Sequence, residues 1–349
     1  MKNMSKVWDC FLFNCELELL SFRLNELSQC VDFFVLVEAT TTFRGEPKPL
    51  YYAQNKSSYQ EFQNQIIHVV VDDMPTETDS PWAREKYQHA AILKGLVDIK
   101  PDDLVIVGDL DEIPKCGVIK ELSSNLSQPT RLLLNHSIYF ANWQLPRQWD
   151  DGPMACRGNQ LQDKHMAFIL GQPEATWNER TDLVFPNAGW HLSYLGGVNS
   201  IKKKFSEICH TELDNSKNRN TKYLENCILF GVDYTGKYLL NILKESELDP
   251  MLERLKIQFP EAFSFPKNHY FFLSVVYRSY VHLRYLSLLP NFLVKVIDDY
   301  PILFCIFLSF PIVICDFSYR TLLKYRLRFR LKQLLNLLIV INKDKSYKS

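Results

Sequence analysis

The sequence predicts an α/β fold built from parallel strand-helix-strand units. Short apolar runs alternate with segments of helical spacing, which is typical of such units. Several of these runs end in acidic residues, at the edge where α/β sheets bind their ligands. The 349 residues are 46% hydrophobic and 13% aromatic, with 40 Lys+Arg against 40 Asp+Glu. This composition excludes a disordered protein and argues against a uniformly basic nucleic-acid binder, so no nucleic acid is expected as a partner.

Each element is predicted from its own pattern. Residues 7–13 form an apolar run that predicts a buried strand, and leucines at helical spacing predict a helix over residues 16–27. Further strands are predicted at residues 33–37, 66–71 and 104–107, and a further helix at residues 82–97. The acidic residues at the predicted strand ends are Glu38, Asp72, Asp73, Asp109 and Asp111.

Asp109 and Asp111 are the strongest candidates for chemistry. They follow the strand at residues 104–107 two positions apart, so both carboxylates can reach one ion if the chain turns there. Hard oxygen ligands suit Mg²⁺ or Mn²⁺, which bridges phosphate oxygens and stabilises a leaving diphosphate. The pattern therefore predicts a metal–nucleotide site, and the alternative is a solvated turn that caps the next helix.

Three further side chains are candidates for binding. His191 lies in segment 189–197, which predicts a strand entering a glycine turn, with a helix over residues 202–210 beyond it. Its imidazole can be a metal ligand or a structural residue. Arg84 can hold a diphosphate through its planar guanidinium or form a surface ion pair. Lys204 ends a run of three lysines that can contact phosphate or lie on a solvated helix face.

Nine segments, taken in order, resemble glycosyltransferase family 17. They are residues 9–14, 16–17, 23–27, 31–38, 43–45, 47–50, 82–85, 109–114 (Asp-Leu-Asp-Glu-Ile-Pro) and 189–194 (Gly-Trp-His-Leu-Ser-Tyr). The resemblance runs from about residue 7 to 235 and implies a GT-A-like nucleotide-sugar fold with a mixed, mainly parallel sheet. It also implies an inverting transfer of a sugar, GlcNAc, from a UDP-sugar to a glycan hydroxyl with the help of Mn²⁺ or Mg²⁺.

The resemblance places these functions on particular residues. The expected metal ligands are Asp109, Asp111 and His191, and the expected catalytic residues are Asp111 and Glu112. The residues expected around the donor are Glu38, Arg84, Asp109, Trp190 and Lys204. An inverting transfer also needs a base for the acceptor hydroxyl. The carboxylates that can serve as this base are Asp150, Asp151, Glu179, Asp182 and Glu212.

Two other functions remain open at this point. One is a non-catalytic, membrane-bound sugar-binding module that keeps the fold without turnover. The other is a metal-dependent phosphohydrolase with Asp109 as nucleophile, because an Asp-x-Asp pair after an apolar strand also occurs in that class. Its usual position is the first strand, whereas here the pair follows the fourth predicted strand.

The C-terminal segment differs from the rest in charge. Residues 271–349 hold twelve basic and four acidic residues, a net charge of +8, so residues 1–270 carry −8. We predict a catalytic domain over 1–270 and a helical tail over 271–349. Residues 300–315 are uncharged, and residues 320–332 hold six basic side chains among apolar ones. This pattern predicts a helix on an anionic membrane surface, and the alternative is a helical subdomain packed on the catalytic core.

The termini and cysteines suggest a location. The first nine residues lack the apolar region of a signal peptide. Nine cysteines, an odd number without a C-x-x-C pair, favour free thiols in a reducing compartment. We therefore expect a protein at the cytoplasmic face of a membrane, peripheral or monotopic, that glycosylates a surface glycan or a lipid-linked sugar.

Overall fold

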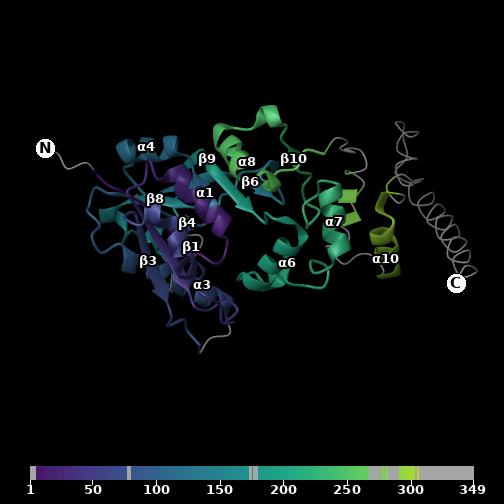
Figure 1. Cartoon of the computed structure of the whole chain (residues 1–349), viewed down its shortest axis with the longest axis horizontal. Helices are drawn as coiled ribbons and strands as arrows, with labels where there is room; N and C mark the ends of the chain where they lie inside the picture. Colours follow the sequence, from purple (N-terminus) through teal and green to yellow (C-terminus); the bar gives the residue numbers. More distant parts are fainter. Residues whose placement is uncertain are drawn as a thin grey trace, which may run out of the picture. The chain divides into compact units, whose positions relative to one another are not determined.

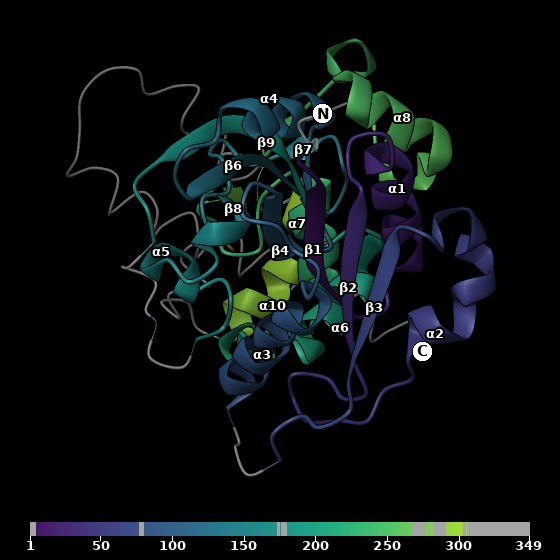
Figure 2. The ribbon, with the colours of Figure 1, turned by 90° about the vertical axis from the view of Figure 1, so that its left-hand side faces the viewer.

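Four parallel strands form one half of a ten-stranded sheet in this computed structural model, in the order β4-β1-β2-β3. β1 (Val7–Phe13) lies between β4 (Leu104–Asp109) and β2 (Phe33–Ala39), and β3 (Ile66–Val71) forms the edge, as Figure 2 shows. Every residue of β1 is buried, as expected for a strand covered on both faces. The four predicted strands are confirmed, although β2 and β4 each continue two residues further than predicted.

The second half of the sheet is mostly antiparallel. Its strands are β5 (Glu112–Pro114), β6 (Thr130–Ile138), β7 (Trp143–Gln144), β8 (Met154–Arg157), β9 (Val184–Ser193) and β10 (Asn241–Ile242). β8 is antiparallel to both β4 and β6, whereas β9 runs parallel to β6 and lies beside it in Figure 1. The mixed α/β sheet is confirmed, but it is less parallel than predicted. One reason is that β6 and β7 are joined by four residues, too few for the crossover that a parallel pair needs.

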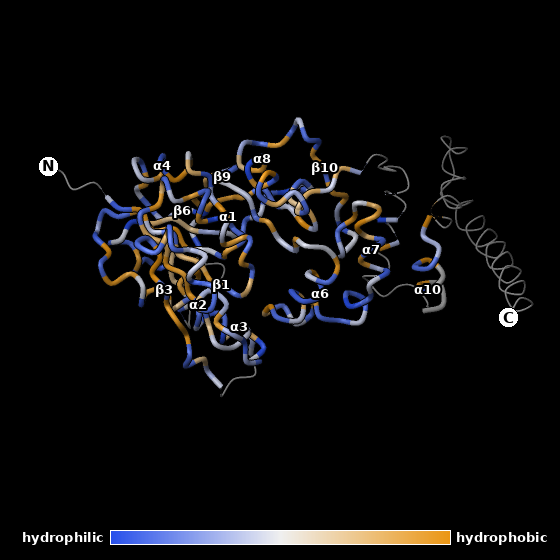
Figure 3. Tube along the Cα trace, in the orientation of Figure 1, coloured by the Kyte–Doolittle hydropathy of each residue, from blue (hydrophilic) through white to orange (hydrophobic). Residues whose placement is uncertain are grey.

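Helices cover both faces of the parallel strands. α1 (Leu17–Leu27), α4 (Cys116–Asn125) and α8 (Pro250–Gln258) share one hydrophobic core with Phe11 and Phe13 of β1. Cys10 and Leu12 face a second core with residues of η2 (Ala91–Gly95) and α5 (Lys164–Ala167). Burial of each large side chain in these cores contributes about 1.5–3 kcal/mol. Figure 3 shows the contrast between the hydrophobic strand β3 and the mostly hydrophilic helix α6 (Gly197–Glu207).

The remaining elements connect or extend these layers. They are α2 (Tyr51–Asn55), η1 (Lys56–Phe62), α3 (Pro81–Ala90), η3 (Gly158–Gln160), η5 (Thr211–Leu213), α7 (Thr221–Leu229), η6 (Glu245–Glu247), η7 (Pro260–Ala262) and α10 (Asn291–Asp299). The predicted helix at residues 82–97 is thus an α-helix that continues as a 3₁₀ helix. The predicted glycine turn after β9 is confirmed, because Gly196 (φ 96°) and Gly197 (φ 79°) adopt the left-handed region that favours glycine.

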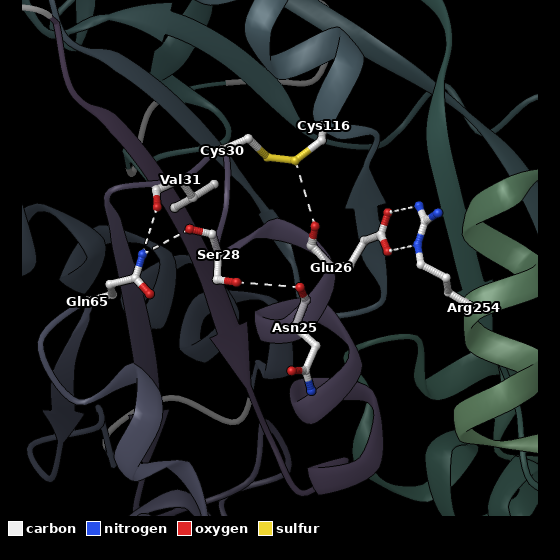
Figure 4. The surroundings of a disulfide bond; sticks show 8 residues. All are labelled: Asn25, Glu26, Ser28, Cys30, Val31, Gln65, Cys116 and Arg254. Atoms are coloured by element: carbon white, nitrogen blue, oxygen red, sulfur yellow. Dashed lines mark hydrogen bonds and ion pairs between the residues drawn. A yellow bond between two sulfur atoms is a disulfide. The ribbon is translucent and has the colours of Figure 1, made fainter.

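A disulfide joins two helices on one face of the sheet. Cys30 follows α1 and Cys116 begins α4, and their Cα atoms are 5.8 Å apart (Figure 4). Beside it, Arg254 of α8 donates two hydrogen bonds, of 2.7 and 2.6 Å, to the Glu26 carboxylate of α1. The expectation of free thiols is wrong for this pair, because the fold brings together cysteines 86 residues apart. The other cysteines that the structure describes form no disulfide, namely Cys10, Cys15, Cys156, Cys209, Cys227 and Cys305.

The structure describes residues 5–76, 80–172, 175, 180–266, 274, 277–278, 280–281, 291–302 and 305. Residues 1–299 group into one unit and residues 300–349 into a second. The predicted boundary at residue 270 and the basic segment 320–332 lie outside the described ranges, so the domain and tail predictions stay predictions. Within those ranges we find no helix with the length and apolar character needed to cross a membrane.

Candidate functional site

The acidic turn, residues 109–112, connects β4 to β5. Asp109 is the last residue of β4, Leu110 is buried in the first core, and Glu112 begins β5. β4 adjoins the central strand β1, so the turn lies at the carboxyl end of the parallel strands. This is the position at which open α/β sheets bind their ligands.

A buried arginine holds the acidic turn in place. Arg23 of α1 donates to the backbone carbonyls of Asp109 (2.7 Å), Leu110 (3.0 Å) and Glu112 (2.9 Å). The same guanidinium donates two hydrogen bonds, of 2.8 and 2.7 Å, to Asp9 of β1. Both side chains are fully buried. The sequence analysis missed this pair, although a charged residue inside a buried strand and another on the helix beside it require partners.

Asp111 is the paired carboxylate of the turn. Its Oδ2 accepts a 2.5 Å hydrogen bond from Nζ of Lys204 in α6 and lies 3.5 Å from Nε2 of His191 in β9. Burial raises the pKa of Asp111, but the Lys204 ammonium and His191 outweigh this and hold it well below its usual range. The structure therefore brings together three residues that the sequence analysis selected.

Asp109 is the more accessible carboxylate. Its side chain is 49% exposed, and its Oδ1 lies 3.8 Å from Nε2 of His89 in α3. The surrounding protein and the negative charge of Asp111 raise the pKa of Asp109 to about 7. The nearest partner of Asp109 is thus more distant than that of Asp111. This leaves the Asp109 carboxylate available to an incoming cation.

Glu112 is buried and accepts two hydrogen bonds. The Asp109 backbone N–H donates to its Oε2 (2.9 Å), and the indole N–H of Trp149 donates to its Oε1 (2.6 Å). Burial and the nearby Asp109 charge raise the pKa of Glu112 well above its usual range. Gly108 allows this packing, because a Cβ atom there would lie 2.8 Å from Oε2 of Glu112.

Next to Glu112 lies a histidine cluster, defined here as His136, Trp149 and His191. His136 of β6 is the strand neighbour of His191, and the two rings stack with centroids 4.5 Å apart. The Trp149 ring lies 5.1 Å from His136 and 4.6 Å from His191. Burial and His191 hold the pKa of His136 well below its usual range, so its ring is neutral. The sequence analysis named His191 but missed His136 and Trp149.

Helix α3 supplies a fourth carboxylate, near the three of the turn. Glu85 accepts a 3.3 Å hydrogen bond from the Cys209 thiol, and burial together with the Asp109 charge raises the pKa of Glu85 to about 7. Its neighbour Arg84 does not lie on the surface. Arg84 is buried and donates to the carbonyls of Pro75 (3.2 Å) and Phe43 (3.1 Å).

Two residues expected around the donor contact other parts of the fold. Glu38 is buried and accepts hydrogen bonds from the N–H groups of Tyr52 (2.9 Å) and Ala53 (3.4 Å), at the start of α2. Trp190 donates its indole N–H to Asp249 (2.9 Å), which caps α8. These contacts give both side chains a structural role.

The predicted base candidates fall in different places. Asp151 lies 3.6 Å from the Arg180 guanidinium, and burial and Asp150 raise the pKa of Asp151. Asp150 accepts hydrogen bonds from Arg180 through its backbone carbonyl, and Asp182 is exposed. Glu212 pairs with His210 at 2.7 Å. Glu179 lies outside the described residues.

The chemistry of the acidic turn fits a divalent cation. Within the described ranges no three His, Cys, Asp or Glu side chains are grouped so that they could hold an ion alone. Mg²⁺ does not require such a group, because one or two carboxylates suffice when substrate phosphates and water complete its shell. Asp109 and Asp111 are the residues that would hold the ion, and Lys204 now occupies one oxygen of Asp111.

The fold and site together define an α/β domain compatible with a glycosyltransferase. Comparison with known proteins shows the family. The model of glycosyltransferase family 17 matches residues 1–246, more than half of the sequence, and the chain belongs to this family. The resemblance seen in the sequence is thereby confirmed.

Three curated relatives carry the name β-1,4-mannosyl-glycoprotein 4-β-N-acetylglucosaminyltransferase. The protein from Rattus norvegicus is 28% identical over 150 residues, which cover 40% of this chain and 28% of the relative. The Homo sapiens protein is 29% identical over 142 residues (38% and 27%), and the Mus musculus protein is 27% identical over 150 residues (40% and 28%). The match thus spans less than a third of each relative.

Proposed function

We propose that this chain is a metal-dependent, inverting glycosyltransferase that moves GlcNAc from a UDP-sugar to a glycan hydroxyl. Family membership supports the transferase class, and the names of the relatives support GlcNAc as the sugar. The single observation that carries the proposal is the acidic turn at the carboxyl end of the central strands, with Lys204 beside it.

The charge around the acidic turn supports a divalent cation as cofactor. Glu112 accepts hydrogen bonds through both oxygens, which favours its ionised form, while burial and Asp109 oppose that charge. Asp109 and Glu85 likewise have a raised pKa. A cation with two positive charges near Asp109 would favour the ionised form of all three carboxyl groups. When bound, Mn²⁺ or Mg²⁺ stabilises the charge of the leaving diphosphate.

The residues of the chain supply the rest of the mechanism. Lys204 offers a second positive charge beside the position expected for the diphosphate, and Arg23 fixes the backbone of the turn. An inverting transfer needs a carboxylate that takes the proton of the acceptor hydroxyl. Asp151 and Glu85 are the two candidates that we propose, because the pKa of each is raised towards neutral pH.

Donor cleavage tests this proposal directly. The purified chain is given a panel of UDP-sugars with Mn²⁺, and release of UDP is measured with and without a chelator. UDP release should depend on the metal, and Asp111→Asn should lower the rate about a hundredfold or more. Asp98→Asn, an exposed carboxylate before β4, is the matched control and should leave the rate unchanged. Equal rates for the two variants would exclude Asp111 from the mechanism.

The base is assigned by separate variants. Glu85→Gln and Asp151→Asn are compared for transfer to an acceptor and for binding of UDP. The variant that removes the base should lose transfer while it still binds UDP. If both variants transfer normally, neither carboxylate is the base.

We also propose that the C-terminal segment binds anionic membranes. Its net charge of +8 supports electrostatic attraction to anionic headgroups, and such attraction is weakened by salt. The full chain should sediment with anionic vesicles at low salt and be released at high salt. Equal sedimentation with neutral vesicles would contradict an electrostatic attachment.

A further inference from the structure

The histidine cluster contains buried polar atoms without a partner. Both ring nitrogens of His136 and Nδ1 of His191 are shielded from solvent and make no hydrogen bond among the described residues. His136 and His191 are 8% and 7% exposed. An unsatisfied buried polar group costs about 1–3 kcal/mol, and native proteins retain few of them. Three such nitrogens at one place therefore indicate a site that a ligand completes.

The strand register places both histidines beside the acidic turn. His191 of β9 pairs with His136 on one side and with Glu112 on the other. Nε2 of His191 lies 3.5 Å from Asp111, the residue next to the expected diphosphate. The cluster thus adjoins the point at which the bond between diphosphate and sugar would lie.

We propose that His136 and His191 form the subsite for the transferred sugar, which binds through hydrogen bonds between its hydroxyl and amide groups and their ring nitrogens. This inference rests on the proposed function. A neutral imidazole offers one donor and one acceptor, and a sugar hydroxyl is its complement because it also offers both. The Trp149 ring, packed against both imidazoles, supplies an apolar wall.

The lining of the cluster disfavours a phosphate as its ligand, because the carboxylates of Asp111 and Glu112 adjoin it. A metal ion on Asp109 and Asp111 could take Nε2 of His191, which lies 3.5 Å from Asp111, and would leave the three unsatisfied nitrogens without a partner. A sugar fits this lining, because it is uncharged and carries several hydroxyl groups.

Comparing UDP with UDP-GlcNAc isolates this subsite. UDP reports the nucleotide and metal contacts alone, and the difference between the two affinities reports the sugar. His136→Phe keeps an aromatic ring but removes both nitrogens. We expect it to weaken UDP-GlcNAc binding about tenfold, as for one or two hydrogen bonds, and to leave UDP binding unchanged in calorimetry with Mn²⁺.

Two further variants complete the test. His136→Asn restores a donor and an acceptor and should recover part of the lost affinity, and it also replaces His136→Phe if that variant does not fold. His165→Phe on α5 is the matched control and should change neither affinity. If His136→Phe and His136→Asn weaken UDP and UDP-GlcNAc equally, or leave both unchanged, the sugar subsite is wrong and the proposed function stands. If the unmodified protein binds neither nucleotide, the proposed function fails and the subsite fails with it.

Discussion

Two buried polar clusters, one in each half of the sheet, differ in how many of their polar atoms have hydrogen-bond partners. In the parallel half, the guanidinium of Arg23 contacts Asp9 and three carbonyls of the acidic turn. In the other half, His136 leaves both ring nitrogens without a partner among the described residues. A complete network stabilises the native fold, whereas unsatisfied buried groups need a partner, which we propose is the transferred sugar. The comparison thus separates residues that position the acidic turn from residues that we expect to bind a ligand.

The largest expected effect comes from breaking the complete cluster. Arg23→Met should lower the free energy of unfolding by about 3–5 kcal/mol, because it leaves Asp9 as a buried charge without a partner. Urea denaturation of both proteins measures the difference. Lys94→Met is the matched control: both members of its ion pair with Asp73 are exposed, so the loss should stay below about 1 kcal/mol. A similar loss in both variants would show that burial of an ion pair does not determine how much it contributes to stability.

The second largest expected effect comes from the disulfide. Replacing Cys30 and Cys116 together by serine should lower the free energy of unfolding by about 2–4 kcal/mol, because the 86-residue loop gains freedom in the unfolded chain. Thiol alkylation and mass spectrometry show whether the bond forms in the purified protein. Disulfides persist in oxidising compartments, so a fully reduced pair in protein from its native source would support the reducing location predicted above.

Substitution of Asp109 should raise the stability of the protein rather than lower it, because the charge of Asp109 opposes folding. The raised pKa of Asp109 means that stability is lost as pH rises from about 4 to about 7. Asp109→Asn removes this loss, so it should stabilise the protein above pH 7 and make no difference near pH 3. Because half of the side chain is exposed, we expect a gain of at most about 1 kcal/mol. Thermal unfolding across this pH range measures the gain. If Asp109→Asn is less stable than the unmodified protein at pH 7, the charge of Asp109 does not oppose folding.

The parallel half was predictable from the sequence, and much of the second half was not. The apolar runs at residues 7–13 and 104–107 define β1 and β4 because a strand buried on both faces is a continuous apolar run that can be recognised without its partners. Asp109 and Asp111 can be recognised for a similar reason, because they come directly after an apolar run. His136 and Trp149 reach His191 only through the register of β6 and β9, which no local pattern specifies. The Cys30–Cys116 pair was missed because connectivity cannot be derived from cysteine spacing alone.

The smallest expected effect sharpens the comparison within the acidic turn itself. Lys204 now satisfies Asp111 as a cation would, whereas Asp109 has only His89 nearby. Lys204→Met should therefore strengthen Mn²⁺ binding a few-fold, because it frees an oxygen of Asp111 and removes a repelling charge. It should also weaken UDP binding, since Lys204 is expected to contact the diphosphate. Lys202→Met, which replaces a half-buried lysine of the same helix that donates to Thr221, should change neither affinity. Weaker Mn²⁺ binding in Lys204→Met would instead mean that the lysine orients Asp111 for the metal.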